Sequence, residues 1–192
     1  MSENTAHLVN VRLRLRKAVL GARRSDTIRK LDTCIEDGRT MWEISQPHWL
    51  WALGEARDAL GLADVSLDYI RLPLRVEVSR AVNPYVRTYR PPGGGPRVDE
   101  MFESVRSGTV INVKVLVLGT VEDGSDTSGK RPPSPEELLD MLDIVGDSIG
   151  ISPWGSKYGY GRFAVERNAA VQQKQTEKEN GKGKTGQDPA GD

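Results

Sequence analysis

The residue types that most often catalyse reactions or bind metals are few in this chain and lie far apart. It has two histidines, His7 and His48, and one cysteine, Cys34. None of them stands at a metal-ligand spacing such as H-x-x-x-H or C-x-x-C. The aspartates between positions 140 and 147 recur at helical spacing opposite an apolar stripe, which is typical of a solvated helix face. The sequence therefore predicts a protein that is not an enzyme and that holds neither a metal nor a cofactor.

Arginines follow the polar face of several predicted strands. In 9–15 apolar and polar residues alternate with period two, so the arginines of this strand share one face. The candidate phosphate-binding residues on the sheet are Arg12, Arg14, Arg16, Arg71, Arg75, Lys114 and Arg162. Cross-strand pairs with Glu77 and Glu166 would neutralise part of this set. Phosphate binding and an ordinary solvated sheet face are therefore equal alternatives.

A second group of candidates lies in the long segment 80–108, where arginines and tyrosines alternate. Its candidate residues are Tyr85, Arg87, Tyr89 and Arg90. Tyrosine rings stack on unpaired bases, and the arginine guanidinium binds phosphate through two parallel hydrogen bonds. The Pro/Gly-rich stretch 91–96 predicts the tip of an extended hairpin or arm. The alternative is a rigid surface loop whose tyrosines pack on the domain.

A third group of candidates lies in the glycine-rich segment 150–163. They are Gly155, Lys157, Gly159, Gly161 and Arg162, interleaved with the aromatic residues Trp154, Tyr158 and Tyr160. Glycines let backbone N–H groups approach a phosphate closely, and the aromatic rings offer stacking surfaces. The alternative is that the glycines only turn the chain tightly while the aromatic residues, Trp154 above all, complete the core.

The elements that must position these groups can be read from periodicity and capping signals. Strands are expected at 9–15, 70–78, 110–118 and 161–166, with Pro73 favouring an edge or an irregularity in the second. Helices are expected at 47–60 and from the capping box at Ser134 to Gly150, with shorter ones at 27–35 and 98–105. This order predicts an α+β, ferredoxin-like (split βαβ) fold: an antiparallel sheet with two helices on one face and an arm inserted between strands 2 and 3.

Length and composition place the chain among globular proteins. Its 192 residues include 37% hydrophobic residues, and 27 basic side chains balance 27 acidic ones. One α+β domain is expected over 1–167, with 80–108 as the inserted arm, and 168–192 is too polar to be ordered. The polar start, the single cysteine and the lack of a run of ~20 apolar residues predict a cytoplasmic protein.

The glycine-rich end resembles two groups of proteins. The pattern I-G-I-S-P-W-G…G-Y-G-R-F-A-V within 146–165 resembles the C-terminal end of a group of uncharacterised bacteriophage-encoded proteins. The order of elements resembles the RAMP superfamily of CRISPR RNA-binding subunits, which have a ferredoxin-like domain, an arm between the second and third strands and a glycine-rich loop after the last helix.

The RAMP resemblance implies that the arm and the glycine-rich loop bind crRNA or another single-stranded RNA. The residues that match the loop by position are Gly155, Lys157, Gly159, Gly161 and Arg162, and those in the matching arm are Tyr85, Arg87 and Arg90. The chain lacks the catalytic histidine arrangement of the RNA-processing members, which argues against RNA cleavage.

These observations predict a non-enzymatic binder of single-stranded nucleic acid, with RNA favoured over DNA, in a phage or CRISPR setting. Its partners would be the nucleic acid and either protein subunits or further copies of itself along the strand. The alternative is a protein-interaction module, such as a phage accessory protein or an inhibitor of host defence, that uses the same arm and aromatic loop. An enzyme that uses carboxylates is the least favoured hypothesis.

Overall fold

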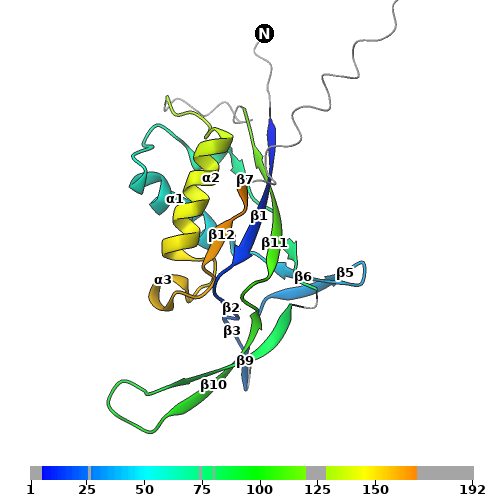
Figure 1. Ribbon diagram of the computed structural model, residues 1–192, viewed down its shortest axis with the longest axis vertical. Helices are drawn as coiled ribbons and strands as arrows, with labels where there is room; N and C mark the ends of the chain where they lie inside the picture. Colours follow the sequence, from blue (N-terminus) through cyan, green and yellow to red (C-terminus); the bar gives the residue numbers. More distant parts are fainter. Residues whose placement is uncertain (1–5, 26, 74, 80, 120–128, 168–192) are drawn as a thin grey trace, which may run out of the picture.

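The computed structural model describes residues 6–25, 27–73, 75–79, 81–119 and 129–167, which form a mixed α+β structure. Three mostly antiparallel β-sheets are joined by two longer helices and several short turns (Figure 1). The tail predicted at 168–192 lies outside the described residues and stays a prediction. Among the described helices, none is long and apolar enough to cross a membrane.

The main sheet contains the four strands in the spatial order β12-β1-β11-β7, and each neighbouring pair is antiparallel. The bounds are His7–Leu15 for β1, Ile70–Arg71 for β7, Val110–Val117 for β11 and Phe163–Val165 for β12. In β1 the four apolar residues Val9, Val11, Leu13 and Leu15 are buried and Arg12 and Arg14 are exposed, which confirms the alternation predicted for 9–15. In the central strand β11, Asn112 and Lys114 are exposed, so only one face is covered.

Two helices cover the apolar face of this sheet (Figure 1). The helix α1 (Gln46–Ala59) forms where a helix is predicted at 47–60, and it buries Trp49, Leu53 and Ala56 on one face. The helix α2 (Pro135–Ile144) begins at the predicted capping box, and a π-helical turn at Val145–Ile149 follows it. Gly150, at φ 82°, ends this turn in a backbone conformation that favours glycine.

The second sheet carries the arm, which we define as the hairpin of β9 (Val82–Tyr89) and β10 (Val98–Val105) with its tip at 90–97. The other edge of β10 pairs with β2 (Val19–Leu20) and β4 (Ile28–Lys30), and β4 pairs with β3 (Arg23–Arg24). The helix predicted at 98–105 is therefore wrong. Eight cross-strand pairs with β9 give this segment the backbone hydrogen bonds that an isolated eight-residue helix would have to supply alone.

The third sheet contains β5 (Thr33–Glu36), β6 (Arg39–Glu43) and β8 (Arg75–Glu77). The helix predicted at 27–35 is wrong, because β4 and β5 occupy that segment. Asp37 and Gly38 both have positive φ, 48° and 72°, and form the two-residue turn between β5 and β6. Asp-Gly is a strong hairpin signal that the helical interpretation overlooked.

The predicted strand 70–78 is split at Pro73 between two sheets. Its first part is β7, at the edge of the main sheet, and its second part is β8, in the third sheet. Pro73 has no N–H for a ladder, so the chain leaves one sheet there and joins another. The remaining regular elements are a 3₁₀ turn at Leu67–Tyr69 and the one-turn helix α3 (Gly155–Tyr158) in the glycine-rich loop.

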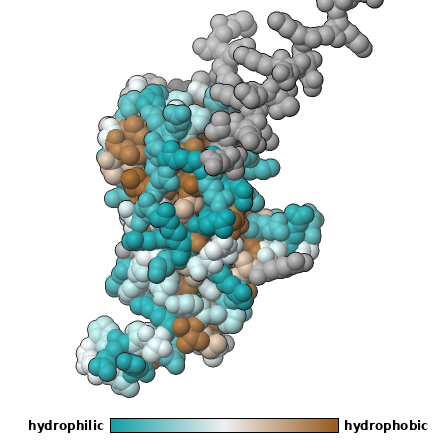
Figure 2. Space-filling view, viewed as in Figure 1, coloured by the Kyte–Doolittle hydropathy of each residue, from teal (hydrophilic) through white to brown (hydrophobic). Residues whose placement is uncertain are grey.

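The three sheets and the helices share one hydrophobic core, which includes Leu13, Trp49, Val76, Leu142 and Phe163. The arm extends away from this body. Figure 2 shows that its tip is hydrophilic to neutral and that hydrophobic atoms gather where the arm leaves the body and over the helices. The fold thus presents an extended polar hairpin on an ordinary packed domain.

Candidate nucleic-acid interface

The arginines of β1 are paired with carboxylates. Arg12 and Arg14 both form ion pairs with Glu166, at 3.3 and 2.6 Å, and Arg16 pairs with Asp147. Glu166 is brought there by the antiparallel pairing of β12 with β1. This half of the predicted interface is therefore largely neutralised, as the predicted cross-strand pairing with Glu166 implies.

Arg71 and Arg75 do not share a sheet face, contrary to the expectation from the alternation. Arg71, on β7, donates hydrogen bonds to the backbone oxygens of Asp68 and Ile70 at 2.6 and 3.3 Å. Arg75, on β8, lies in the third sheet and bridges Glu36 and Glu43, and these hydrogen bonds raise its pKa. The physical reason for the separation is the break at Pro73.

The candidate nucleic-acid-binding residues of the arm lie next to the glycine-rich loop. Tyr85, Arg87 and Tyr89 alternate along β9 and so project from one face of the hairpin. The Arg87 guanidinium carbon lies 4.0 Å from the centroid of the Tyr158 ring and 5.5 Å from that of Tyr89. Lys157 adds its ammonium 5.3 Å from the same Tyr158 centroid. The structure thus unites the arm and loop candidates in one place.

The charge of Arg87 is not neutralised by a carboxylate. Glu100 faces Arg87 across the hairpin, but its carboxylate pairs with Arg29 of β4. No carboxylate in the described part of the chain forms an ion pair with Arg87. The Arg87 cation lies against Tyr158 instead, and the proximity of Arg87 first, and then of Lys157, lowers the pKa of the Tyr158 hydroxyl.

A pair of tyrosines ties the arm to the loop beside this arginine. The hydroxyl oxygens of Tyr85 and Tyr160 are 3.3 Å apart, and their rings meet edge to face with centroids 6.0 Å apart. Burial first, and then the hydrogen bond with Tyr85, raise the pKa of Tyr160 to about 12. We call Tyr85, Arg87, Tyr89, Lys157, Tyr158 and Tyr160 the tyrosine–arginine cluster.

The glycines of the loop serve its own packing. The N–H groups of Gly155, Gly159 and Gly161 each donate to a protein carbonyl, and each donor–acceptor distance is 2.7 Å. A Cβ on Gly155 would overlap the carbonyl oxygen of Ile149, and one on Gly161, at φ 72°, would lie 2.5 Å from the Ser152 nitrogen. These amides are therefore not open to a phosphate, and the tight-turn alternative accounts for the glycines.

Trp154 and Arg162 also contribute mainly to the fold. The Trp154 ring meets Phe102 edge to face with centroids 6.1 Å apart, and its Nε1 donates to the Gly21 carbonyl at 3.2 Å. Arg162 reaches the Ser148 carbonyl at 3.4 Å, and its buried Nε has no hydrogen-bond partner. Trp154 thus packs the loop against the second sheet.

Arg29 is a residue of this region that the sequence interpretation missed. Its guanidinium carbon lies 5.2 Å from the Trp154 ring, and its partner Glu100 is the carboxylate that Arg87 faces. The sequence signal that could have identified Arg29 is the Asp37-Gly38 turn, because such a turn predicts strands rather than a helix in the segment before it.

Several exposed cations without a carboxylate partner in the described ranges lie near the arm and the loop. Arg90 and Arg97 flank the arm tip, and Lys157 lies in the loop. The others in this set are Lys17, Arg24, Lys30, Arg71, Arg106, Lys114 and Lys130. The positive charge available to a ligand therefore includes the cluster and the arm, whereas Arg12, Arg14 and Arg16 are paired with carboxylates.

One serine stands in a pattern that is associated with nucleophilic catalysis. Gly146–Gly150 matches G-x-S-x-G around Ser148. The nucleophile elbow places such a serine between a strand and a helix, whereas Ser148 lies in the π-helical turn that ends a helix. His48 is engaged by the Gly150 carbonyl oxygen at 3.0 Å rather than by Ser148. We assign no nucleophile here.

No protein-family model matches the chain, and no curated protein matches it. Among solved structures, it is similar to a chain of a CRISPR RNA-guided surveillance complex, with a TM-score of 0.45 and 12% identity over 83% of this chain. It is also similar to Csc2 of Thermofilum pendens, with a TM-score of 0.32 and 12% identity over 85% of this chain. The chain spans 66% of the length of each of these proteins. Likenesses of this size establish neither a common fold nor a common function.

Proposed function

We propose that the chain binds single-stranded nucleic acid at the tyrosine–arginine cluster and along the arm, and that it catalyses no reaction. RNA is favoured over DNA on the sequence resemblance to the RAMP superfamily. In a CRISPR or phage setting, further protein subunits or copies of the chain would be its partners along the strand. We also propose that the main sheet with α1 and α2 is a ferredoxin-like core, which the strand order fourth-first-third-second supports.

The observation that carries this proposal is the position of Arg87. Its guanidinium is half-buried against the rings of Tyr158 and Tyr89, and no described carboxylate pairs with it. A partly desolvated cation without a counter-ion is costly, whereas Arg12 and Arg14 share the Glu166 carboxylate and Arg75 bridges Glu36 and Glu43. A phosphate would supply the missing charge and match the planar donors of arginine.

The aromatic surfaces favour a single strand over a duplex. The Tyr158 side chain is 42% exposed next to the Arg87 and Lys157 cations. An unpaired base presents a π-face that can stack on such a ring, whereas the faces of duplex bases are covered by their neighbours. Arg90 and Arg97 continue the positive charge toward the arm tip, which suits a strand that runs from the cluster along the arm.

Titration with fluorescent oligonucleotides of the same sequence in RNA and DNA, repeated at several salt concentrations, tests the proposal. Arg87→Ala and Lys157→Ala should each weaken binding to all sequences. Each should also reduce the slope of log K against log salt by about 0.7, the value for one phosphate contact on a single strand. Tyr158→Ala should cost about 1–3 kcal/mol with little change of the slope, because stacking releases no counter-ions.

Arg39→Ala is the matched control, because Arg39 is exposed but is paired with Glu77 at 3.1 Å. It should leave both affinity and salt slope close to those of the wild type. If the wild type binds no oligonucleotide at low salt, or if Arg39→Ala weakens binding as much as Arg87→Ala, the proposed interface is wrong.

A protein-binding function is the second candidate, and one surface of the arm favours it. Val86 and Met101 lie opposite each other on the hairpin face that the cluster does not use, and their exposed fractions are 54% and 44%. Neighbouring exposed apolar side chains of this kind are common at protein interfaces. A partner bound there would be lost in Val86→Ser, whereas nucleic-acid affinity would be retained.

A further inference from the structure

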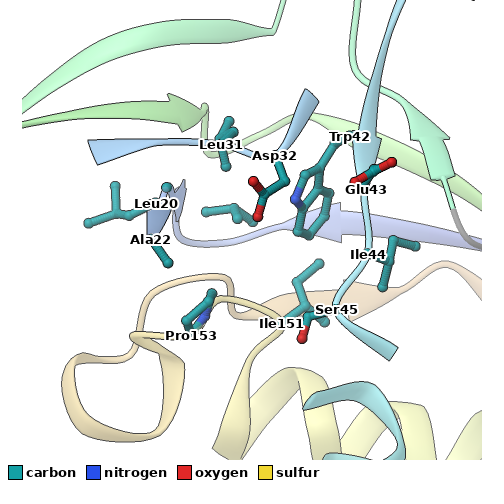
Figure 3. Close-up of a pocket in the computed structure, with 12 residues that line it drawn as sticks. Leu20, Ala22, Leu31, Asp32, Trp42, Glu43, Ile44, Ser45, Ile151 and Pro153 are labelled. Carbon is teal, nitrogen blue, oxygen red and sulfur yellow. The ribbon is translucent and has the colours of Figure 1, made fainter. Parts of the chain in front are cut away.

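A cavity of about 240 Å³ lies where the second and third sheets meet the glycine-rich loop (Figure 3). Its walls come from four separate segments: the chain at 19–22, the link between β4 and β5, the end of β6, and the start of the loop. Leu31, Trp42, Ile44 and Ile151 give it buried apolar walls. It is a ready-formed hollow for a small, largely apolar and planar group.

One carboxylate in this cavity is available to a ligand. Figure 3 shows the Asp32 carboxylate and the Trp42 ring facing the hollow above Ile151 and Pro153, while the Glu43 carboxylate turns away. Glu43 is occupied by Arg75 at 2.9 Å. Among the described residues, Asp32 has only Arg23 as an ion-pair partner, at 3.9 Å, which is too long for a hydrogen bond.

Trp154 connects the cavity with the tyrosine–arginine cluster. Gly21 lines the cavity, and the carbonyl of Gly21 accepts the hydrogen bond from Trp154 Nε1. Pro153, which also lines the cavity, is the residue before Trp154, whose ring centroid lies 6.2 Å from that of Tyr158. Trp154 therefore contacts both a residue of the cavity wall and a residue of the cluster. The exposed cations Arg24 and Lys30 lie on the two strands beside the cavity.

We propose that this cavity takes one unstacked base of the bound strand and that Asp32 reads its Watson–Crick edge. This inference rests on the proposed function and adds a base preference to it. A carboxylate accepts hydrogen bonds only, so it favours bases that present N–H groups there. Guanine offers two adjacent donors, N1–H and the 2-amino group, whereas uracil has one N–H flanked by two carbonyl oxygens that the carboxylate repels.

The test uses three RNA 12-mers in the wild type and in Asp32→Asn: oligouridylate, the same strand with guanosine at every fourth position, and that strand with inosine in place of guanosine. The wild type should bind the guanosine strand about fivefold to tenfold more tightly than oligouridylate, as expected for one partly exposed bidentate contact. Inosine, which lacks the 2-amino group, should retain only part of this preference.

Asp32→Asn should bind oligouridylate at least as well as the wild type, with the same salt slope, and should lose the preference for guanosine. Glu55→Gln is the control, since Glu55 is an exposed carboxylate on α1 that does not line the cavity. Thermal melts of both variants check that the fold is retained.

Equal affinity of the wild type for all three strands would overturn the base pocket while leaving the proposed function in place. A guanosine preference that persists in Asp32→Asn would also overturn it. Absence of binding to every strand would overturn the pocket and the proposed function together. Where the wild type does bind, the Arg87→Ala and Lys157→Ala titrations test the cluster independently of the pocket.

Discussion

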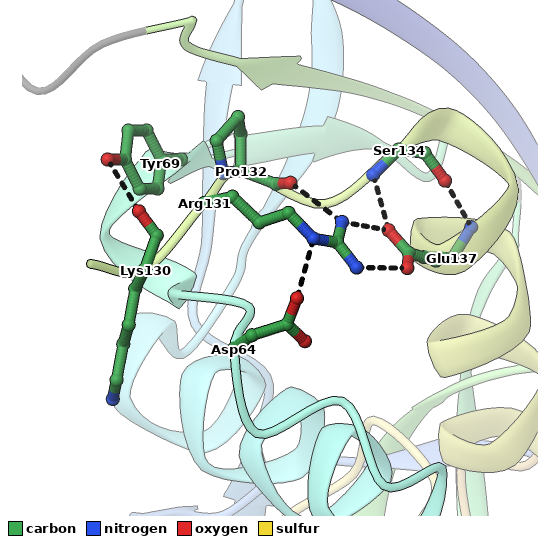
Figure 4. Close-up of polar contacts among 7 residues, drawn as sticks. All are labelled: Asp64, Tyr69, Lys130, Arg131, Pro132, Ser134 and Glu137. Carbon is green, nitrogen blue, oxygen red and sulfur yellow. Dashed lines mark hydrogen bonds and ion pairs between the residues drawn. The ribbon is translucent and has the colours of Figure 1, made fainter.

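The stability of the chain at low pH depends on the Glu137 carboxylate, which is hydrogen-bonded at the start of α2. The Glu137 carboxylate accepts two hydrogen bonds from the Arg131 guanidinium at 2.7 Å and one from the Ser134 N–H at 2.8 Å (Figure 4). Arg131 also donates to Asp64 at 2.7 Å, in the segment after α1. These contacts therefore connect the start of α2 with the segment that follows α1. The perturbation that we consider is Glu137→Gln, which preserves the shape of the side chain but removes its charge.

The size of the effect follows from the pKa of Glu137. The hydrogen bonds from Arg131, the largest cause, lower this pKa from 4.5 to about 2. Such a change corresponds to roughly 3 kcal/mol when no solvent screens the charges. The Glu137 side chain is 22% exposed and Arg131 is more exposed, so water and salt reduce this figure. We expect Glu137→Gln to lower the free energy of unfolding by about 1–2 kcal/mol at pH 7.

The direction in which the stability changes with pH follows from the lowered pKa of Glu137. A carboxyl group whose pKa is lower in the folded than in the unfolded state binds fewer protons when folded, so it stabilises the fold above about pH 4.5. That stabilisation disappears as the pH falls from about 4.5 to about 2. Urea unfolding of the wild type and of Glu137→Gln at pH 7, 4 and 2.5 should show a difference that shrinks toward low pH.

Glu136→Gln is the control, because Glu136 is an exposed carboxylate in the same helical turn and forms no ion pair with a described residue. It should change the free energy of unfolding by only a few tenths of a kcal/mol, through the helix dipole. The reasoning is refuted if Glu137→Gln lowers stability equally at pH 7 and pH 2.5, or if the two variants behave alike.

Two further predictions concern the glycine-rich loop. Gly155→Ala should lower the free energy of unfolding by about 1–3 kcal/mol, because the new methyl group overlaps the Ile149 carbonyl; Gly95→Ala, in the open arm tip, should leave chemical unfolding unchanged. Tyr160 should ionise only near pH 12, so absorbance titration at 295 nm should show that Tyr160→Phe lacks the last tyrosine transition. The folded state holds the Tyr160 proton more tightly than the unfolded state does. Protonated Tyr160 therefore stabilises the fold below pH 10, and this contribution is lost between pH 10 and about 12.

The parts of the fold that the sequence predicts well are those in which local pattern and burial agree. The alternation in β1 and the capping box at Ser134 fix a strand and a helix start, and the structure has both. The segment 98–105 lacks such agreement, since its strand character comes from pairing with β9 rather than from its own residues. The segment 27–35 was misassigned because a weak helical pattern outweighed the Asp37-Gly38 turn signal.

Some features of the candidate site can likewise be predicted from the sequence, and others cannot. Arginines and tyrosines alternate along the segment that forms β9, but spacing along the chain does not show that Tyr85 meets Tyr160, 75 residues away. The alternation also indicates the pairing of the β1 arginines with Glu166, but it does not show that Asp147, in the π-helical turn after α2, reaches Arg16. The role of the loop glycines depends on the carbonyls that their amides meet, which a sequence does not reveal.

The engaged amides of the glycine-rich loop determine how binding at the cluster would behave. The N–H groups of Gly155, Gly159 and Gly161 are used within the protein, and Gly155 and Gly161 leave no room for a Cβ, so the loop holds its shape before any ligand arrives. Tyr158 and Lys157 are then presented from a preorganised loop, so little conformational entropy is lost there on association. Mutations within one interface change the dissociation rate more than the association rate, so changes that loosen the loop, such as Gly155→Ala, should act mainly by speeding dissociation.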